Sequence, residues 1–480
     1  MLMRIKELEY TGISDDSRTI KKGDIFFAII GSKLDGHKFI QEAVRKGASA
    51  VVTDKDFKGE VNGIKIIRVS NPRITLGEFA RDFYNRPSDR LKVIGITGTN
   101  GKTTVSYLLA EVLKKAGHQT GIIGTICHRW NDKIVKANNT TPGIIELQRL
   151  LNTMTEDSVE YCVMEVSSHS LDQDRVFGID FNSAIFTNIT SEHLDYHKQF
   201  SDYLAAKTKL FRMLKPARSA ILNLDDENFD IIRRCTHAKI ITYGVKKEAD
   251  VRAEKIRIGL EKTEFLVKTK KVSFWVTTPL IGIFNVYNIL AAISYALNEG
   301  MPLEIIKEAI SNFKGAEGRL ELVASGGDFK VFIDYAHTDN ALENVLTALR
   351  GITKNRLILV FGCGGDRDTL KRPRMGKVAS RLSDYFFITS DNPRSEDPLT
   401  IAKEIEKGID KHFKNYKIIL ERFEAIREAV NIARKGDIIL IAGKGHEKYQ
   451  IIGAKTIPFS DREVAEQILS KKGLMTKCLA

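Results

Sequence analysis

Residues 98–104 read GTNGKTT, which is the composition of a loop that binds phosphate groups. An apolar run, 91–97, precedes this loop, and apolar residues with helical spacing follow it. A Gly-rich turn between a strand and a helix lets backbone N–H groups and the helix dipole face phosphate oxygens. Lys102 supplies a positive charge, and the hydroxyl group of Thr103 can bind Mg²⁺. The sequence therefore predicts an enzyme that uses ATP.

The loop departs from the standard P-loop pattern at one position. Residue 96, five positions before Gly101, is Ile and not Gly. A Gly-rich turn that only joins a strand to a helix is the alternative explanation. The order of strand, loop, lysine and helix favours phosphate binding over this alternative.

The elements that position this loop are predicted from the alternation of apolar runs with helical patterns. Runs of this kind at 91–97, 121–125, 161–166, 183–188 and 220–224 indicate a mostly parallel sheet with helices on both faces. After Arg319 a second series begins, at 330–335, 356–361, 385–390, 417–420 and 437–442. It predicts a separate doubly wound, Rossmann-like domain.

The predicted fold class is α/β with three domains. Residues 1–88 form a small α/β N-terminal module, and residues 89–317 form a central P-loop ATPase-like domain with a parallel or mixed sheet. Residues 318–480 form the C-terminal Rossmann-like domain.

Ligands bind beyond the carboxyl ends of parallel strands, so the residues that follow each strand carry the functional predictions. In the central domain, Glu165 begins the segment EVSSHSLDQDR, and His193 lies in ITSEHLDYH. Glu165 alone could cap a helix, and His193 alone could make an ordinary hydrogen bond. Because both follow strands that flank the phosphate loop, they are predicted Mg²⁺ ligands.

In the C-terminal domain, four polar segments follow strands: DYAHTDNALE, GCGGDRDTLKRP, DNPRSEDP and GKGHEKYQ. Turn chemistry explains their Gly, Asp, Asn and Pro residues. It does not explain why Arg367, Arg394 and Glu447 meet at one sheet edge. We therefore predict a pocket for an amino acid that carries both charges.

Composition excludes several classes of protein. The chain has 480 residues, 43% hydrophobic and 28% charged, with a net charge of +13. Its N-terminal segment lacks the apolar stretch of a signal peptide, and no run is long enough to span a membrane. The Lys and Arg residues are scattered and form no stripe with aromatic residues. We expect a cytoplasmic monomer without membrane insertion and without bound nucleic acid. The positive charge could attract polyanionic small substrates, but a solvated surface is the simpler explanation.

The motifs above, together with DSR at position 16, YLAAKTKLF around Lys207 and GIFNVYN around Asn285, resemble those of the Mur ligases, in particular the MurE branch. The resemblance implies peptidoglycan precursor synthesis. ATP would phosphorylate the γ-carboxylate of D-Glu in UDP-N-acetylmuramoyl-L-Ala-D-Glu. An amino group of meso-diaminopimelate would then attack the acyl phosphate, and ADP and phosphate would be released.

The resemblance also implies the catalytic groups, Lys102, His193 and Lys207. One of two Mg²⁺ ions would lie near Thr103 and Glu165. The second would lie near His193 and Lys207, with Lys207 modified by CO₂ to a carbamate. Without the resemblance, Lys207 would be interpreted as an ordinary helical lysine.

The binding residues implied by the resemblance form three sets. The nucleotide sugar and its peptide would contact Ser17, Ser32, Lys33, Leu34, Asn139, Thr140, Thr141, Ser167, Gln173 and Arg175. ATP would contact Gly98, Thr99, Asn100, Gly101, Lys102, Thr103, Thr104, Asn285, Asn288, Arg319 and Asp334. Diaminopimelate would contact Arg367, Asp391, Asn392, Pro393, Arg394, Gly443 and Glu447.

The choice of diaminopimelate depends on DNPR, because relatives that add L-lysine usually differ at its Arg position. Arg394 and Arg367 can bind a carboxylate that L-lysine lacks, and an unpaired buried guanidinium disfavours L-lysine. Asp339 occupies a position where many relatives have Pro, which leaves the geometry of that loop open.

Three alternatives stay open. The same reaction could use L-lysine. A folylpolyglutamate synthetase-like ligase shares the phosphate loop but lacks the uridine-binding module and DNPR. A P-loop protein that binds nucleic acid is favoured only by the basic composition.

Overall fold

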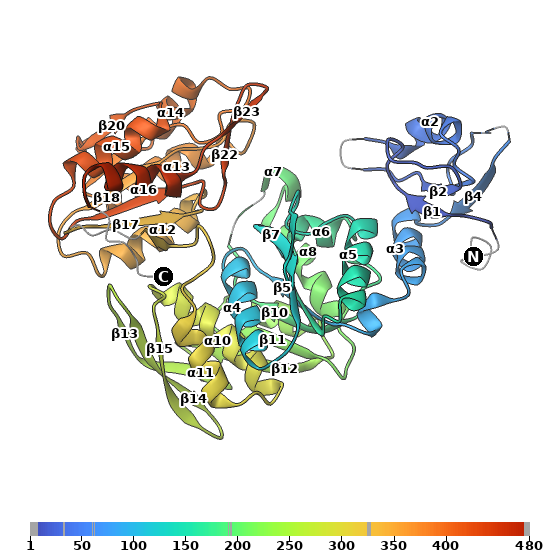
Figure 1. Cartoon of the computed structure of the whole chain (residues 1–480), viewed down its shortest axis with the longest axis horizontal. Coiled ribbons are helices and arrows are strands. Elements are labelled where there is room, and N and C mark those ends of the chain that lie inside the picture. The colour runs from blue at the N-terminus through green and yellow to red at the C-terminus, as the bar shows by residue number, and fades with distance from the viewer. Residues whose placement is uncertain are drawn as a thin grey trace.

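The computed structural model describes residues 8–31, 34–59, 61, 63–190, 192, 194–323 and 328–474. Within these residues the strands form a 4-stranded, an 11-stranded and a 6-stranded sheet, together with a 2-stranded hairpin. The three larger sheets form the centres of three lobes, which follow one another along the chain (Figure 1). The predicted α/β fold class is confirmed.

The N-terminal lobe has a parallel sheet in the order β1-β2-β3-β4. Side chains on β2 alternate between two cores, with Phe27 in one and Phe26 in the other, because successive residues of a strand point to opposite faces. Asn71 caps α3 through hydrogen bonds from the next two N–H groups after Pro72. The elements are β1 (Gly12–Ser14), β2 (Asp24–Phe27), η1 (Gly36–Phe39), α2 (Ile40–Arg45), β3 (Ala50–Asp54), β4 (Lys65–Val69), α3 (Pro72–Phe83) and η2 (Pro87–Asp89).

The first part of the middle lobe carries the phosphate loop between β5 and α4. Its elements are β5 (Lys92–Thr97), α4 (Lys102–Lys115), β6 (Thr120–Ile123), β7 (Cys127–Trp130), β8 (Lys133–Lys136), α5 (Ile144–Glu156), β9 (Tyr161–Glu165), α6 (Ser168–Asp172), β10 (Phe181–Phe186), α7 (Leu194–His197) and α8 (Phe200–Arg212). The second part contains β11 (Ser219–Asn223), α9 (Phe229–Arg233), β12 (Lys239–Gly244), β13 (Val251–Ile258), β14 (Thr263–Thr269), β15 (Ser273–Thr278), α10 (Ile283–Asn298) and α11 (Leu303–Asn312).

Strands β10, β5 and β9 are parallel neighbours at the centre of the middle sheet. Ile94 of β5 lies in a core with α4, α10 and α11, whereas Val93 lies in a core with α5 and α8. Helices therefore cover both faces, as predicted. The segments that follow these three strands come together at one edge of the sheet, where the phosphate loop lies.

The middle sheet is mixed, which is one of the two predicted forms, because it has antiparallel additions at both ends. These added strands were not individually predicted. Strands β13, β14 and β15 form an antiparallel meander at one end, and β7 and β8 form a hairpin at the other. Along β15, exposed residues such as Trp275 alternate with buried ones such as Val276. This pattern is typical of an antiparallel strand with one face in water.

The C-terminal lobe is doubly wound, with sheet order β16-β17-β21-β18-β19-β20. All pairs in it are parallel except β16 with β17. One core contains α12, α13 and α14, and the core on the other face contains α15 and α16. The elements are β16 (Glu321–Val323), β17 (Lys330–Asp334), α12 (Asp339–Arg350), β18 (Leu357–Phe361), α13 (Lys371–Leu382), β19 (Tyr385–Ile388), α14 (Pro398–Glu406), β20 (Tyr416–Ile418), α15 (Arg422–Ile432), β21 (Ile438–Ala442), β22 (Tyr449–Ile452), β23 (Lys455–Pro458) and α16 (Asp461–Lys471).

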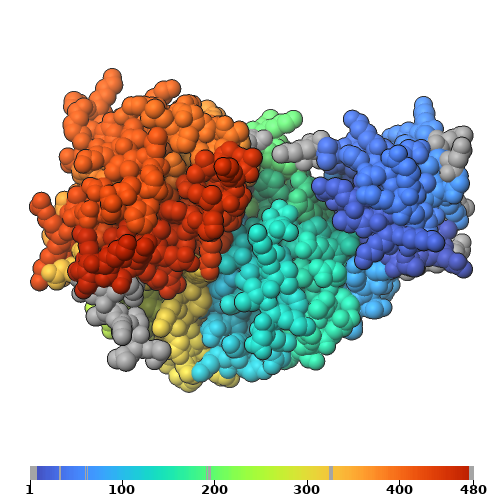
Figure 2. Space-filling view, turned by 45° about the horizontal axis from the view of Figure 1, so that its top comes forward, coloured from blue at the N-terminus to red at the C-terminus, as the bar shows by residue number. Residues whose placement is uncertain are grey.

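The middle lobe contacts both of the others, and the N-terminal and C-terminal lobes lie at opposite ends of the molecule (Figure 2). Asn100 of the phosphate loop donates a hydrogen bond to Oδ1 of Asn340 at the start of α12, at 3.1 Å. On the other side, Arg73 of α3 donates to the carbonyl oxygens of Ile30 and Gln173, at 2.5 and 3.1 Å. The bonds to Asn340 and Gln173 connect the lobes close to the predicted site, whereas the bond to Ile30 lies within the N-terminal lobe.

No helix in the described stretches combines the length and the apolar composition that crossing a bilayer requires.

Candidate active site

The phosphate loop turns tightly between β5 and α4. Gly101 has φ +89°, and a Cβ atom there would lie 2.3 Å from Oδ1 of Asn288. Gly98 has φ +152°, and a Cβ atom there would lie 1.9 Å from Oγ1 of Thr187. Side chains are therefore excluded from both positions, which leaves the loop backbone accessible to a ligand.

Two lysines converge on this loop. Lys102 and Lys207 each donate a hydrogen bond to the carbonyl oxygen of Gly98, at 2.9 and 2.8 Å. Lys207 is 1% exposed, and its ammonium group lies 4.6 Å from the centre of the Tyr203 ring. The pKa of Lys207 is lowered well below its ordinary value, mainly by burial and to a smaller extent by the positive charge of Lys102. Lys207 therefore tends toward the free amine, which is the nucleophilic form of lysine.

Glu165, the last residue of β9, is fully buried beside the loop. Its Oε2 accepts hydrogen bonds from the hydroxyl groups of Thr103 and Thr125, each at 2.9 Å. Its Oε1 accepts a hydrogen bond from the backbone N–H of Thr125 at 3.0 Å. Glu165 does not cap the following helix, α6, because the side chain of Ser167 does so. The structure thus brings Thr103 and Glu165 together, and it adds Thr125, which the sequence did not predict.

These groups fit a magnesium ion. A carboxylate and a hydroxyl group are hard oxygen ligands, and Mg²⁺ in nucleotide sites takes one or two carboxylates together with phosphate oxygens and water. His193 lies outside the described residues, so of the second predicted pair only Lys207 is seen.

The predicted peptide-binding residues form a chain of hydrogen bonds that starts at Glu165. Thr141 donates from Oγ1 to the carbonyl oxygen of Glu165 at 2.9 Å, and accepts from the N–H of Ser167 at 3.1 Å. Arg175 donates to the carbonyl oxygen of Thr141 at 3.2 Å and to Oε1 of Gln173 at 2.6 and 3.0 Å. Four of the predicted residues are therefore held in one network.

The residues predicted to bind uridine do not form a comparable hydrogen-bond network among the residues that the structure describes. Ser17 is buried, and its hydroxyl group donates to Oε2 of Glu42 at 2.8 Å. Leu34 is 67% exposed. Ser32 and Lys33 lie outside the described residues.

The predicted ATP contacts from the second half of the chain lie near the loop. Asn288 donates to Oδ1 of Asn285 at 3.1 Å, on α10. Arg319 donates to Oγ1 of Thr103 at 3.2 Å, and its guanidinium lies 4.7 Å from the centre of the Tyr335 ring. Burial raises the pKa of Asp334 to about 6, although the positive charge of Arg319 acts in the opposite direction.

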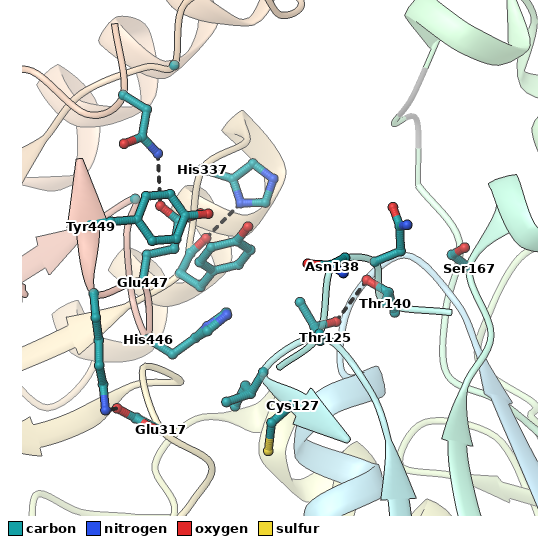
Figure 3. Close-up of a pocket in the computed structure, with 18 of the residues that line it drawn as sticks. Thr125, Cys127, Asn138, Thr140, Ser167, Glu317, His337, His446, Glu447 and Tyr449 are labelled. Atoms are coloured by element: carbon teal, nitrogen blue, oxygen red, sulfur yellow. Dashed lines mark hydrogen bonds and ion pairs between the residues drawn. The ribbon is translucent and has the colours of Figure 1, made fainter. Parts of the chain in front are cut away.

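The middle and C-terminal lobes enclose one cavity of about 1970 Å³. Figure 3 shows its two sides, with the C-terminal residues His337, His446, Glu447 and Tyr449 facing the middle-lobe residues Thr125, Asn138, Thr140 and Ser167. Thr141 and Arg175 line the same cavity as Arg367, Arg394 and Asp391. Segments from both predicted groups of polar loops thus border a single space, whereas residues 98–104 of the phosphate loop are not among its lining residues.

The DNPR segment borders this cavity in a strained conformation. Arg394 has φ +52°, which is uncommon for a residue other than Gly, and its Nη1 donates to the carbonyl oxygen of Gly365 at 2.5 Å. A Cβ atom at Gly443 would lie 2.7 Å from Oδ2 of Asp391. Pro393 is buried and does not line the cavity. The predicted residues that do line the cavity include the cations Arg367 and Arg394 and the carboxylates Asp391 and Glu447.

Glu447 has a partner, Lys444, that the sequence did not predict. Oε2 of Glu447 accepts hydrogen bonds from Nζ of Lys444 at 3.0 Å and from Nδ2 of Asn392 at 2.9 Å. Lys444 is fully buried. The pattern Lys-Gly-His-Glu could have indicated this pair, since the two side chains are three residues apart in a tight turn.

Comparisons with known proteins follow the same division into lobes. Three family descriptions match: "Mur ligase family, catalytic domain" over residues 9–84, "Mur ligase middle domain" over 96–296 and "Mur ligase, glutamate ligase domain" over 318–445. The chain is 45% identical over 469 residues to a protein of Clostridium tetani named UDP-N-acetylmuramoyl-L-alanyl-D-glutamate--2,6-diaminopimelate ligase, covering 97% of this chain and 96% of the relative. It is 44% identical to a protein of the same name from Bacillus licheniformis, covering 96% and 95%.

A solved structure with that ligase name is 33% identical, with a TM-score of 0.70, covering 97% of this chain and 95% of the other. A folylpolyglutamate synthase from Mycobacterium tuberculosis shares the fold at 17% identity, with a TM-score of 0.63 and 78% of this chain covered. With matched family descriptions in all three lobes and near-full-length relatives, this chain belongs to the Mur ligase family.

Proposed function

We propose that this protein is an ATP-dependent ligase that joins meso-diaminopimelate to the γ-carboxylate of D-Glu in UDP-N-acetylmuramoyl-L-Ala-D-Glu. The products are the amide, ADP and phosphate, in peptidoglycan precursor synthesis. Its near-full-length relatives carry the name of this activity. The observation that carries the proposal is the single cavity, which Arg175 of the middle lobe and Arg394 of the C-terminal lobe both line.

In this proposal the residues of the phosphate loop bring two anions together. The loop and Lys102 bind the triphosphate, while Arg175 binds a carboxylate of the peptide. Mg²⁺, held by Thr103 and Glu165, would neutralise phosphate charge. Arg367 and Arg394 bind a carboxylate of diaminopimelate so that its amino group lies in line with the acyl phosphate. Gly443, Asp391 and Glu447 orient the ammonium end.

We also propose that Lys207 carries a carbamate and, with His193, binds a second Mg²⁺. The depressed pKa and full burial of Lys207 support this, because only a neutral amine reacts with CO₂. The carbamate would convert this neutral amine into an anionic oxygen ligand, whose charge is complementary to the ammonium group of Lys102.

The domain boundaries after residues 88 and 317, the monomeric state and, since the reaction consumes ATP, a cytoplasmic location remain part of this proposal.

The test is ADP release by the purified protein with ATP, Mg²⁺ and UDP-N-acetylmuramoyl-L-Ala-D-Glu. We expect ADP release with meso-diaminopimelate and at most about one hundredth of that kcat/KM with L-lysine, because L-lysine leaves guanidinium groups unpaired. Equal kcat/KM for the two amino acids would overturn the specificity and leave the ligase reaction intact. ADP release with folate and glutamate instead would favour the folylpolyglutamate alternative.

A further inference from the structure

Lys444 is a fully buried lysine that the proposed reaction does not use. It lies in the turn between β21 and β22, and its ammonium group lies 5.6 Å from the centre of the Tyr449 ring. Its Nζ donates to Oδ1 of Asn392 at 3.2 Å and to Oε2 of Glu447 at 3.0 Å. A buried charge is unfavourable unless it is paired, so these three side chains must act as one unit.

This unit fixes the orientation of an amide. Oδ1 of Asn392 accepts hydrogen bonds from Lys444 and from the N–H of Ile451, the latter at 3.0 Å. The NH₂ group of Asn392 is therefore directed to Oε2 of Glu447, at 2.9 Å. In the part of the chain that the structure describes, these bonds use Oε2 and leave Oε1 of Glu447 for a ligand. Glu447 borders the cavity, with its side chain 16% exposed.

Lys444 also sets the charge at this end of the cavity. Asp391 and Glu447 are two carboxylates that line it, and the buried ammonium group of Lys444 pairs with Glu447. Lys444 therefore offsets one of the two negative charges that would face the ammonium end of the incoming amino acid. Without Lys444, two carboxylates would repel each other across a half-buried space.

We propose that Lys444 is a positioning residue of the amino-acid pocket, which holds Asn392 and presents one oxygen of Glu447 to the ammonium end of the incoming diamino acid. This inference rests on the proposed function. Lys444 itself does not touch the substrate.

The experiment compares Lys444→Met and Lys444→Gln with a matched control, Lys403→Met. Lys403 also pairs with a glutamate three residues later, Glu406 at 2.8 Å, but on an exposed face of α14. We would measure KM for meso-diaminopimelate, ATP and the nucleotide peptide, together with the thermal midpoint. For Lys444→Met we expect KM for diaminopimelate to rise about tenfold or more, with the other two KM values within about twofold.

Lys444→Gln keeps a hydrogen-bond donor but removes the positive charge. Its KM for diaminopimelate should therefore lie between those of the wild type and Lys444→Met. Lys403→Met should leave every value unchanged. If all three KM values rise together with a lower thermal midpoint, or if KM for diaminopimelate changes less than about twofold, Lys444 is only structural and the inference fails. If Lys444→Met does not fold, a wild-type KM in Lys444→Gln also overturns it. A wild-type protein that releases no ADP with diaminopimelate refutes the proposed function as well.

Discussion

Lys102 and Lys207 approach one carbonyl oxygen, that of Gly98, from two directions. Glu165 is buried on the other side of the loop and accepts every hydrogen bond that Thr125 can offer it. At this scale the chemistry depends on charges that are held in place before a substrate arrives, which lowers the reorganisation needed during the reaction.

The carbamate proposal predicts the effect of Lys207→Ala. We expect kcat to fall roughly a hundredfold or more, because an anionic ligand beside the phosphates is lost, and added bicarbonate should not restore it. Mass spectrometry under non-denaturing conditions should show a CO₂ adduct on the wild type and none on the variant. Lys209→Ala is the control, because Lys209 lies two residues further along α8 with its side chain partly exposed, and this variant should stay active. A fully active Lys207→Ala protein would refute the carbamate.

The specificity proposal predicts the effect of Arg394→Ala. We expect kcat/KM for meso-diaminopimelate to fall roughly a hundredfold while the value for L-lysine stays the same or rises, because diaminopimelate loses a carboxylate partner and L-lysine no longer leaves this guanidinium unpaired. Steady-state ADP release with both amino acids measures the ratio. Arg381→Ala, which removes an exposed pair with Glu343, should leave the ratio unchanged. Equal losses for both amino acids would instead indicate that Arg394 only shapes its loop.

Part of the site was predictable from single residues and part was not. Thr103 and Glu165 were predicted because they lie at the ends of strands that meet at the same sheet edge, whereas Arg175 was predicted from the family resemblance. Thr125 and Lys444 were missed because no sequence pattern connects Thr125 to Glu165, 40 residues away, or shows that Lys444 is buried. The hydrogen bond between Asn100 and Asn340 joins two lobes, which local spacing does not reveal.

At the scale of elements, the strand ends determine where functional groups lie. The predicted strand 91–97 corresponds to β5, and 437–442 corresponds to β21, each within one residue at either end. These strands are buried on both faces and therefore appear in the sequence as continuous apolar runs. Strands β13 and β14 were not predicted because Lys, Arg and Glu alternate along their water-exposed faces, which resembles a loop in composition.

The geometry of the strand-loop-helix unit predicts the effect of Gly101→Ala. A Cβ atom would collide with Asn288 and the backbone would stay at positive φ, so binding of Mg²⁺-ATP should be lost. Gly117→Ala is the matched control, because Gly117 also has a positive φ, +92°, but a Cβ atom there would meet nothing within 4 Å. It should cost about 1 kcal/mol of stability and leave the KM for ATP unchanged. Unaltered nucleotide binding by Gly101→Ala in titration calorimetry would contradict this assignment.

At the scale of the whole molecule, the cavity belongs to neither lobe alone. Asn340 accepts hydrogen bonds from Asn100 and from Thr190, so α12 of the C-terminal lobe contacts two loops of the middle lobe. Arg73 connects the N-terminal lobe to Gln173, which in turn is bonded to Arg175. The position of each outer lobe is thereby coupled to the residues that are proposed to bind substrate.

Two buried histidines of the C-terminal lobe predict its stability against acid. Burial lowers the pKa of His337 to about 4 and that of His446 to about 3. Since these values lie below the ordinary 6.5, the unfolded chain takes up protons at a higher pH than the folded protein does. The free energy of unfolding is therefore highest above pH 6.5 and decreases as the pH falls toward 4. At pH 5, each histidine should lower the free energy of unfolding by about 1 to 2 kcal/mol relative to its value above pH 6.5.

Urea denaturation at pH 8 and pH 5 measures this loss. His446→Gln should lose less stability between the two values than the wild type, because glutamine takes up no proton. His237→Gln, at an exposed position, is the control and should behave as the wild type. An equal pH-dependent loss in His446→Gln and the wild type would contradict the prediction.

The phosphate loop and the proposed amine pocket lie on different sheets, which are joined covalently only by the segment after α11. Exchange of the C-terminal lobe between homologous chains would therefore alter the nucleophile that is accepted, while the phosphate loop, Glu165 and Lys207 stay in the middle lobe. Such chimaeras, joined near residue 315, should accept the nucleophile of the chain that supplies the C-terminal lobe, provided that the contacts of Asn340 with Asn100 and of Arg319 with Thr103 are kept.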